Sequence, residues 1–281
     1  MSTISITGLI TYPVKSMKGV AIESTRITNK GLAYDRQWMV VRSNGRFVTQ
    51  RDLGEMSLIH TRLDENGLVL SKPACGSISI PYDLHHGHPL ETMVWKDACE
   101  TLDQGTEISN WLTQALQSNE PLHLVRMRPG FNRSLSKKAL MSGETSTIFA
   151  DGAPLLLANE ASLDRLNSVL ESKALHTVPM NRFRPNIIVR GLQPFAEHRQ
   201  ATLTAETYQL KLCFPCQRCV VTTIDQDSAE KDSRGQPFKT LQLINPMPGD
   251  SKAPAFGENA ILTHGNDEII AVGDALEIIY L

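Results

Sequence analysis

Residues 213–225 read Cys-Phe-Pro-Cys-Gln-Arg-Cys-Val-Val-Thr-Thr-Ile-Asp and hold three of the five cysteines in the chain. Before them, apolar and polar residues alternate from Tyr208 to Phe214, which is the two-residue period of a half-buried strand. The β-branched residues between Cys219 and Ile224 predict a second strand. Because proline has no N–H to donate to a sheet, Pro215 predicts a loop between the two strands. The stretch therefore predicts a short loop that presents cysteine and arginine between two stiff elements.

Length and composition describe an ordinary globular protein. The chain has 281 residues, of which 41% are hydrophobic and 21% are charged, enough for one large or two modest domains. Its net charge of -2 gives no reason to expect a nucleic acid polymer or an anionic membrane as partner. No apolar run approaches the roughly 20 residues that span a bilayer, and the N-terminus lacks the apolar segment of a signal peptide. With an odd number of cysteines, these features predict a cytoplasmic protein with reduced thiols.

Most of the remaining chain carries strand patterns. Asn44-Gly45 is typical of a hairpin turn that follows a strand. An amphipathic helix is predicted from Ile108 to Leu116, with Asp103 or Thr106 as its cap, and a second helix begins at Asn159. We therefore expect a mainly β protein with flanking helices (α+β), divided near residues 119–122. The expected strands lie at residues 4–10, 37–41, 68–70, 78–80, 187–189, 260–262, 269–271 and 275–280.

The three clustered cysteines allow several interpretations. Spaced Cys-x2-Cys-x2-Cys, they could be three ligands of a zinc or iron–sulfur site, which needs a fourth ligand that the sequence does not offer nearby. They could equally be packed thiols without chemistry. Cys219 lies next to Arg218, and a guanidinium favours the thiolate form that soft metals bind. Strand alternation directs Cys213 away from the other two.

Several cationic residues stand at the ends of strand patterns. Lys15, Arg36, Arg182 and Arg184 are ordinary surface charges when taken singly, but together they could converge on a phosphate or another anion. The basic run at 126–138 is either a solvated loop or the border of a substrate entrance. Motifs of the HExxH, GxSxG, GxGxxG and GxxxxGK[ST] types are absent, so hydrolase, dinucleotide and nucleoside-triphosphate functions lose support.

Four segments occur in a family-specific order. They are Tyr-Pro-Val-Lys-Ser at 12–16, Gly-Leu-Ala-Tyr-Asp-Arg at 31–36, Phe-Arg-Pro-Asn-Ile at 183–187, and Cys-Gln-Arg-Cys at 216–219 with Thr-Thr-Ile-Asp at 222–225. The set resembles MOSC proteins with an N-terminal MOSC β-barrel domain, the family of the mitochondrial amidoxime reducing component and its bacterial counterparts. The resemblance spans nearly the whole chain. It implies an N-terminal β-barrel-like domain over residues 1–119 and a C-terminal MOSC β-barrel over residues 120–281.

The resemblance also implies a molybdenum cofactor, Mo-molybdopterin, whose metal is bound by a cysteine thiolate. That ligand corresponds to Cys219. Lysine and arginine would satisfy the phosphate of the cofactor by charge-assisted hydrogen bonds. Three of the implied contacts stand where relatives carry hydroxyl residues, so that Gln217, Gly152 and Ala153 would act through backbone groups. The other implied cofactor contacts are Lys15, Ser16, Arg36, Arg184, Asn186 and Arg218.

For function, the resemblance implies an oxidoreductase that reduces small N-hydroxylated compounds (amidoximes, hydroxylaminopurines), a detoxifying reaction that releases water and the amine. No cysteine follows Cys219, so we expect no ferredoxin domain like that of some bacterial relatives, and we expect electrons from a separate ferredoxin- or flavoprotein-type donor. Two alternatives remain. One is a MOSC-type carrier of molybdenum cofactor or sulfur without turnover, and the other is a structural zinc protein that uses Cys216 and Cys219.

Overall fold

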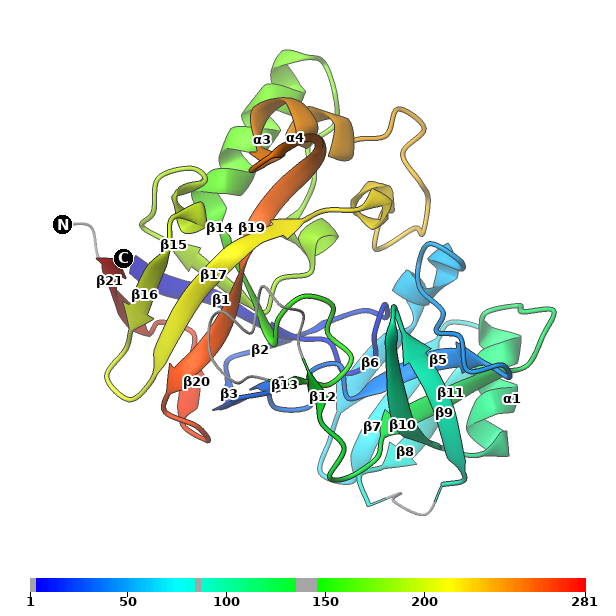
Figure 1. The fold of residues 1–281 in the computed structure, drawn as a ribbon. Helices are drawn as coiled ribbons and strands as arrows, with labels where there is room; N and C mark the ends of the chain where they lie inside the picture. The colour runs from blue at the N-terminus through cyan, green and yellow to red at the C-terminus, as the bar shows by residue number, and fades with distance from the viewer. Residues whose placement is uncertain (1–3, 84–86, 135–145) are drawn as a thin grey trace.

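The computed structural model describes residues 4–83, 87–134 and 146–281. Its largest sheet closes into a barrel (Figure 1), because the first and last of seven consecutively paired strands also pair with each other. The first two strands run parallel and the other neighbours antiparallel. In order around the barrel the strands are β14 (Leu155–Asn159), β15 (Ile187–Arg190), β1 (Ile4–Thr11), β21 (Ala275–Tyr280), β16 (Ala201–Thr204), β17 (Gln209–Gln217) and β19 (Asp250–His264). The predicted C-terminal barrel is confirmed.

The interior of the barrel is filled by the apolar residues of the alternating patterns. Leu210 and Leu212 of β17 are buried, as are Leu157, Ile187 and Val189 on the strands that follow around the barrel. Each such side chain contributes about 1.5–3 kcal/mol when it is fully removed from water. Short strands flank the barrel: β2 (Val20–Ile22), β3 (Ser24–Thr28), β4 (Gly31–Leu32), β18 (Pro246–Met247) and β20 (Ile269–Ala271).

Beside the barrel lies a half-barrel made of two sheets around a second core. Trp38 and Leu124 of one sheet, Leu68 and Leu70 of the other, and Leu112 of helix α1 (Thr106–Ala115) share this core. One sheet has the order β5 (Trp38–Arg42), β11 (Leu122–Met127), β10 (Asp97–Asp103) and β9 (Pro89–Val94). The other has the order β6 (His60–Leu63), β7 (Gly67–Lys72) and β8 (Gly76–Pro81), and β12 (Arg133–Ser134) pairs separately with β13 (Ser146–Thr147). The predicted mainly β class with flanking helices is confirmed.

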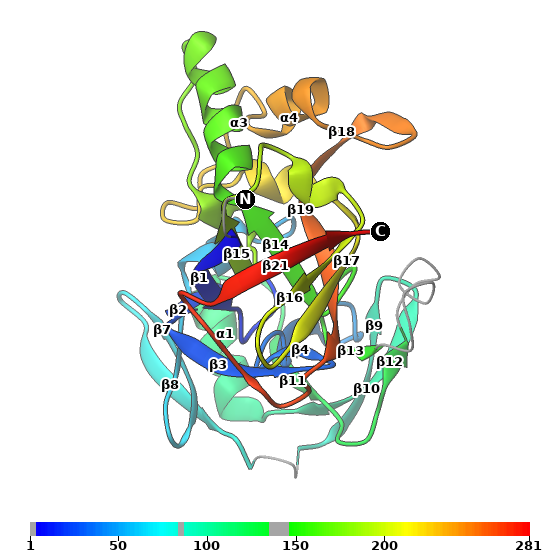
Figure 2. The ribbon, with the colours of Figure 1, turned by 90° about the vertical axis from the view of Figure 1, so that its left-hand side faces the viewer.

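The longer helices lie at opposite ends of the molecule. In Figures 1 and 2, α3 (Glu160–Ser172) and α4 (Phe238–Ile244) lie together beyond one end of the barrel, whereas α1 packs on the half-barrel. The Asn159 side chain accepts a hydrogen bond from Ala161 N at 3.2 Å, so the predicted start of the second helix is confirmed. The predicted cap of the first helix is wrong. Gly105 occupies that position without a side-chain cap, because Asp103 instead accepts from the Gly105 N–H at 2.9 Å. Four 3-10 helices complete the described segments: η1 (Gly54–Leu58), η2 (Met180–Phe183), η3 (Ala196–His198) and η4 (Val220–Thr223).

Strand pairing crosses the predicted boundary at residues 119 and 120 in both directions. β1, from the start of the chain, pairs with β15 and β21 inside the barrel. β11, which follows the boundary, pairs with β5 and β10 in the half-barrel. The division into 1–119 and 120–281 stays a prediction. The consequence for the site is that the N-terminal segments deliver their cationic residues to one end of the C-terminal barrel.

The cysteine segment differs from its predicted form. β17 continues through Pro215 to Gln217, with register shifts before Phe214 and after Pro215, so the predicted loop is wrong. The predicted second strand is also wrong, because η4 takes its place. Thr222 donates from both its N–H and its hydroxyl to Cys219 O, at 3.1 and 2.9 Å, and the Thr223 hydroxyl donates to Val220 O at 2.7 Å. These hydroxyl bonds stabilise a turn that strand propensity alone opposes.

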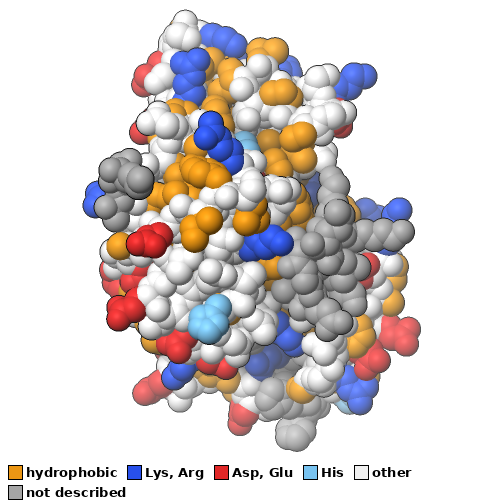
Figure 3. Space-filling model, turned by 60° about the vertical axis from the view of Figure 1, so that its left-hand side comes forward, with side chains coloured by type: hydrophobic (Ala, Val, Ile, Leu, Met, Phe, Trp, Pro, Cys, Tyr) orange, Lys and Arg blue, Asp and Glu red, His pale blue; other side chains and the backbone are white. Residues whose placement is uncertain are grey.

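The surface carries mixed charge. On the face shown in Figure 3, hydrophobic side chains lie in separate groups between basic and acidic ones, in keeping with the net charge of -2. Among the residues that the structure describes, no helix combines the length and the apolar character needed to cross a membrane.

Candidate functional site

A pocket opens where the barrel meets the half-barrel, with an empty volume of about 820 Å³ that includes its solvent-open part. All predicted site residues except one line it. The exception, Gln217, is an exposed residue of β17. Their roles as cofactor contacts stay a prediction, but the expected convergence of a sulfur and several cations is present. The predicted residues at the pocket are Lys15, Ser16, Arg36, Gly152, Ala153, Arg184, Asn186, Arg218 and Cys219.

Lys15 follows β1 and enters the pocket with a side chain that is only 7% exposed. Its ammonium group donates to Phe149 O at 2.8 Å and to Asp151 at 2.6 Å. Burial lowers the pKa of Lys15, and the charge of Asp151 opposes that shift. The carboxylate also accepts from Trp95 Nε1 at 2.8 Å. Asp151 therefore ties the lysine of the barrel side to a tryptophan of the half-barrel.

Two guanidinium groups lie against the same tyrosine ring. Arg36 and Arg184 have their guanidinium carbons 4.4 and 4.3 Å from the centre of the Tyr12 ring. Burial raises the pKa of Tyr12 to about 12, so the ring is a neutral phenol. Arg36, Arg184 and Ser16 all have left-handed backbones, with φ of 45°, 55° and 70°. Such strained conformations persist where the surroundings fix them, and they concentrate at functional sites.

Asn186 positions Arg36 through its side-chain amide. Its oxygen accepts from Arg36 Nη1 at 3.0 Å and from Leu156 N at 3.2 Å, while its nitrogen donates to Ile10 O at 3.1 Å and Asp35 at 2.9 Å. Arg36 also pairs with the buried Asp35 at 2.6 Å. An amide offers two donors and two acceptor sites, so this network uses its full capacity. The Asn186 side chain thus orients a cation and has no donor left for a ligand.

Two arginines at the pocket keep buried nitrogens without a partner among the described residues. Arg184 donates from Nη1 to Met17 O at 2.7 Å, but its Nη2 is unpaired, as is Nε of Arg218. Burial lowers the pKa of Arg184 to about 10, and the neighbouring charge of Arg36 adds to that effect. A buried unpaired donor costs about 1–3 kcal/mol, and more when it is charged. An anionic acceptor in the pocket would remove this cost.

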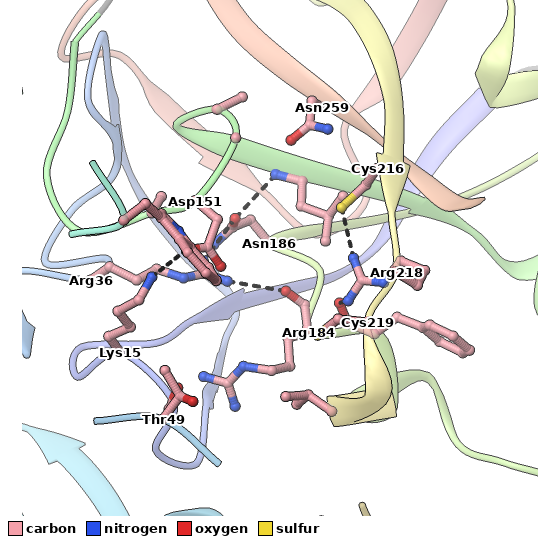
Figure 4. A pocket seen from close by; sticks show the side chains of 18 of the residues that line it. Lys15, Arg36, Thr49, Asp151, Arg184, Asn186, Cys216, Arg218, Cys219 and Asn259 are labelled. Carbon is pink, nitrogen blue, oxygen red and sulfur yellow. Dashed lines mark hydrogen bonds and ion pairs between the residues drawn. The ribbon is translucent and has the colours of Figure 1, made fainter. Parts of the chain in front are cut away.

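Two of the three clustered cysteines face the same pocket, each with an arginine beside its sulfur. Arg218 Nη1 lies 2.8 Å from Cys216 Sγ, and Arg51 Nη2 lies 3.3 Å from Cys219 Sγ. Figure 4 shows Lys15 and Arg36 on one side of the space, with the two cysteines and Arg218 on the other. The third cysteine lines a separate pocket. Within the described ranges no group of three or more His, Cys, Asp or Glu side chains is arranged to hold a metal ion.

Some expectations about the cationic residues were wrong. Arg182 does not join the pocket, because it donates to Asp225 at 2.7 Å and to Thr222 O at 3.3 Å. In the basic run, Arg128 pairs with Glu100 and the buried Arg133 with Asp97, both in β10. None of the described residues of the run lines the pocket. Residues 135–138 lie outside the described part of the chain.

Sequence reasoning missed several residues of the pocket. Arg51 and Trp95 come from turns of the half-barrel that carry no periodic pattern, so nothing in the sequence connects them with Cys219. Thr49, which lies shortly before Arg51 in the same turn region, also lines the pocket and was missed. Asn259 carries a detectable signal, because it and the buried Glu258 interrupt an otherwise apolar strand. Consecutive residues of a strand point to opposite faces, and buried polar groups need polar partners, so these two residues indicate a polar environment on each face of the strand.

Comparison with known families identifies the class of protein. The model described as the MOSC N-terminal beta barrel domain matches residues 3–119, and that of the MOSC domain matches residues 144–277. The fold and the pocket thus belong to a two-part MOSC protein. A solved structure, the YUAD protein from Bacillus subtilis, aligns over 99% of this chain and 97% of that chain at 8% identity, but its TM-score of 0.40 supports no inference.

Whole-chain relatives identify the family more closely. "Mitochondrial amidoxime-reducing component 1" of Homo sapiens is 32% identical over 284 residues, which cover 95% of this chain and 81% of the relative. The protein of the same name from Xenopus laevis is 31% identical over 286 residues, which cover 96% of this chain and 80% of the relative. The chain therefore belongs to the family of MOSC proteins that includes the amidoxime-reducing components.

Proposed function

We propose that this protein is a molybdenum-cofactor-dependent reductase of small N-hydroxylated compounds such as amidoximes and hydroxylaminopurines. The observation that carries the proposal is the pocket in which five cationic side chains face two cysteine sulfurs. Only one carboxylate, that of Asp151, lines the same pocket among the described residues. This excess of positive charge suits a bound anion. The names of the relatives supply the reaction class.

The residues at the pocket fit molybdopterin. The unpaired buried nitrogens of Arg184 and Arg218 are donors that a phosphate would satisfy. At Gly152 an added Cβ would lie 2.9 Å from Asn259 Oδ1, so a side chain at this position would be crowded. Because glycine has no side chain, its backbone is accessible to a ligand in the pocket. Cys219 is the proposed ligand of the metal, since a thiolate suits a soft metal. When bound, the cofactor supplies the two-electron redox chemistry, and the chain provides binding and orientation.

The reaction breaks the N–O bond of the substrate with two electrons and two protons and releases water and the amine or amidine. Arg51 contacts the Cys219 sulfur, Trp95 lies against Arg51, and the two would orient the substrate in the pocket. The electrons would come from a separate ferredoxin- or flavoprotein-type donor, and the activity would serve detoxification. Cytoplasmic localisation stays a proposal, and the names of the relatives place those proteins in mitochondria.

The proposal is tested on protein purified from a host that makes molybdopterin. Molybdenum content and the reduction of benzamidoxime by a chemical electron donor are measured for the wild type, Cys219→Ala and Cys216→Ala. We expect Cys219→Ala to lose both molybdenum and turnover, while Cys216→Ala retains the metal. A protein that binds molybdenum without reducing benzamidoxime would instead be a cofactor or sulfur carrier. Equal molybdenum in the wild type and Cys219→Ala would remove Cys219 as the ligand.

A further inference from the structure

A second cavity adjoins the candidate site on the half-barrel side. Its empty volume is about 840 Å³, and it shares Thr49, Arg51 and Trp95 with the first pocket. The shared residues place the two spaces side by side, and Arg51, which contacts the Cys219 sulfur, lines both. A molecule whose reacting group lies at Cys219 can therefore place its remaining part in the second cavity. The cavity residues that are not shared are Arg46, Phe47, Asp52 and Met93.

The wall of this cavity is aromatic and partly exposed. Trp95 is 49% exposed and Met93 is 45% exposed, which is unusual for side chains of this size. Phe47 contacts the Trp95 ring edge-on, with ring centres 5.2 Å apart. A parallel bridge between Arg46 and Met93 connects the backbone of this wall and includes a hydrogen bond of 3.2 Å from Met93 N to Gly45 O. The Trp95 ring itself is held by the hydrogen bond of 2.8 Å from its Nε1 to Asp151.

The charge of the cavity is positive, and its cations are weakly paired. Arg46 is 72% exposed and lies 3.9 Å from Asp52, too far for a hydrogen bond. The other oxygen of Asp52 accepts from the N–H and the hydroxyl of Thr49, at 3.0 and 3.1 Å. The guanidinium carbon of Arg51 lies 4.9 Å from the centre of the Trp95 ring, and its Nη2 donates to the sulfur of Cys219 at 3.3 Å. Both guanidinium groups can therefore donate hydrogen bonds to a bound anion.

We propose that this cavity is a substrate subsite for a planar aromatic ring system that carries a phosphate group. The ring would stack on Trp95, and the phosphate would pair with Arg46 and Arg51, as guanidinium groups pair with phosphate oxygens. The proposal rests on the proposed function for the reacting group and extends it to substrate class. Among N-hydroxylated purines, it favours nucleoside monophosphates over nucleosides.

Ligand binding is measured first, without turnover. Full-length protein purified with its cofactor is titrated with adenosine 5′-monophosphate and with adenosine while tryptophan fluorescence is recorded. Of the three tryptophans, Trp95 lines the second cavity and is expected to report ligand binding. Trp38 is fully buried, and Trp111 lines neither cavity and donates to Cys75 O. We expect the monophosphate to quench at about fivefold lower concentration than adenosine, the effect of about 1 kcal/mol from an exposed ion pair. Trp95→Leu should abolish the quenching.

Arg46→Gln should remove most of the preference for the monophosphate. Arg62→Gln is the matched control, since Arg62 is 64% exposed, pairs with Asp64 and lines neither cavity. Equal binding of the two ligands, quenching that persists in Trp95→Leu, or equal effects of the two arginine variants would overturn the subsite.

Turnover of substrates with and without a phosphate group distinguishes failure of the subsite from failure of the proposed function. N6-hydroxyadenosine 5′-monophosphate should show about fivefold higher kcat/KM than N6-hydroxyadenosine in the wild type, a difference lost in Arg46→Gln. Benzamidoxime carries no phosphate, so its reduction should be equal in Arg46→Gln and Arg62→Gln. If benzamidoxime is not reduced while the monophosphate still quenches Trp95, the reductase proposal fails and the subsite stands. If benzamidoxime is reduced but the phosphate confers no preference, only the subsite fails.

Discussion

Arg51 donates a hydrogen bond of 3.3 Å from Nη2 to the sulfur of Cys219, which lies 168 positions later in the chain. The contact joins a turn of the half-barrel to the segment that leaves the barrel at β17. It also places a positive charge beside the sulfur of the proposed metal ligand. The half-barrel therefore contributes directly to the candidate site.

Replacing this arginine should weaken the site without unfolding the protein. We expect Arg51→Gln to lower benzamidoxime turnover by about three- to tenfold, because an exposed charge-assisted bond contributes at the low end of the range for such bonds. Turnover is measured per bound molybdenum, so that loss of metal and loss of rate are separated. Arg62→Gln carries the same charge change on an exposed pair and serves as the control. Wild-type turnover in Arg51→Gln would mean that the contact has no role in the reaction.

Arg184 illustrates a conflict between stability and ligand binding. Its buried Nη2 has no partner among the described residues, and the Arg36 guanidinium lies against the same tyrosine ring. In cofactor-free protein, Arg184→Met should therefore be neutral or stabilising, by up to about 1–4 kcal/mol, as for other buried charges replaced by apolar residues. The same change should abolish molybdenum binding. Urea unfolding of the cofactor-free protein and metal analysis of the loaded protein measure the two effects. A destabilisation of several kcal/mol in the cofactor-free protein would contradict the argument.

Gly19 packs against the Tyr12 ring, which both guanidinium groups contact. A Cβ at Gly19 would approach Tyr12 Cε1 to 2.5 Å and Ile10 Cγ2 to 2.7 Å. Tyr12 is 2% exposed, so the ring has no space into which it can move. We expect Gly19→Ala to lower the free energy of unfolding by about 1–3 kcal/mol, the usual cost of overpacking, and to reduce molybdenum content.

A matched variant is available on the preceding strand. At Gly8 the nearest atom to an added Cβ would be Cδ1 of Ile188, at 3.2 Å, and this terminal methyl can rotate away, while the other Ile188 atoms lie at ordinary contact distances of 3.6 and 3.8 Å. Gly8→Ala should therefore change stability and metal content much less than Gly19→Ala when both are compared by urea unfolding and metal analysis. Equal effects of the two substitutions would show that the Tyr12 ring is not held as tightly as its contacts indicate.

The sequence predicted what depends on repeating local patterns. The alternation before Cys213 marks β17, and the amphipathic spacing around Leu112 marks α1. It failed where one side chain decides the local structure. The hydroxyl of Thr222 turns a β-branched run into η4, and Asp225 removes Arg182 from the pocket. The pairing of Arg182 with Asp225 becomes visible only when the chain is folded, since no local pattern indicates a contact between residues 43 positions apart.

The same limit applies to the site. Lys15, Arg36 and Arg184 could be named because they belong to family motifs at strand ends, and the structure places them around one pocket. Arg51 and Trp95 belong to turns, where residue types are weakly constrained and the partner lies in another sheet. Only the docking of the half-barrel against the barrel brings them to the pocket.

On the far side of β19 from the pocket, Glu258 forms a buried polar cluster. It is 1% exposed, and its Oε2 lies 2.9 Å from His198 Nδ1. The other ring nitrogen of His198 lies 2.9 Å from Asn245 Nδ2, which also donates to Ala255 O. Burial raises the pKa of Glu258 to about 9, with a further contribution from the charge of Glu197, and burial lowers the pKa of His198 to about 4. The glutamate and the histidine are therefore both uncharged at neutral pH.

This cluster gives the stability of the protein a defined pH dependence. Between pH 4.5, where an unfolded glutamate ionises, and about pH 9, the folded protein holds a proton that the unfolded chain has released. Up to about pH 6.5 the unfolded His198 holds a proton that the folded residue lacks, which offsets this difference, so the free energy of unfolding falls as the pH rises from about 6.5 to about 9. Glu258→Gln keeps the shape and the hydrogen-bonding capacity but cannot ionise. We expect it to match the wild type near pH 4.5 and to exceed it by a few kcal/mol at pH 9.

Urea unfolding at pH 4.5, 7 and 9 measures the difference between the two proteins. Glu277→Gln is the matched control, because Glu277 is an exposed residue of β21 that undergoes the same chemical change. Its free energy of unfolding should follow the wild type at every pH. Parallel curves for Glu258→Gln and the wild type would mean that Glu258 is already ionised in the folded protein, since a group that titrates alike in both states adds no slope.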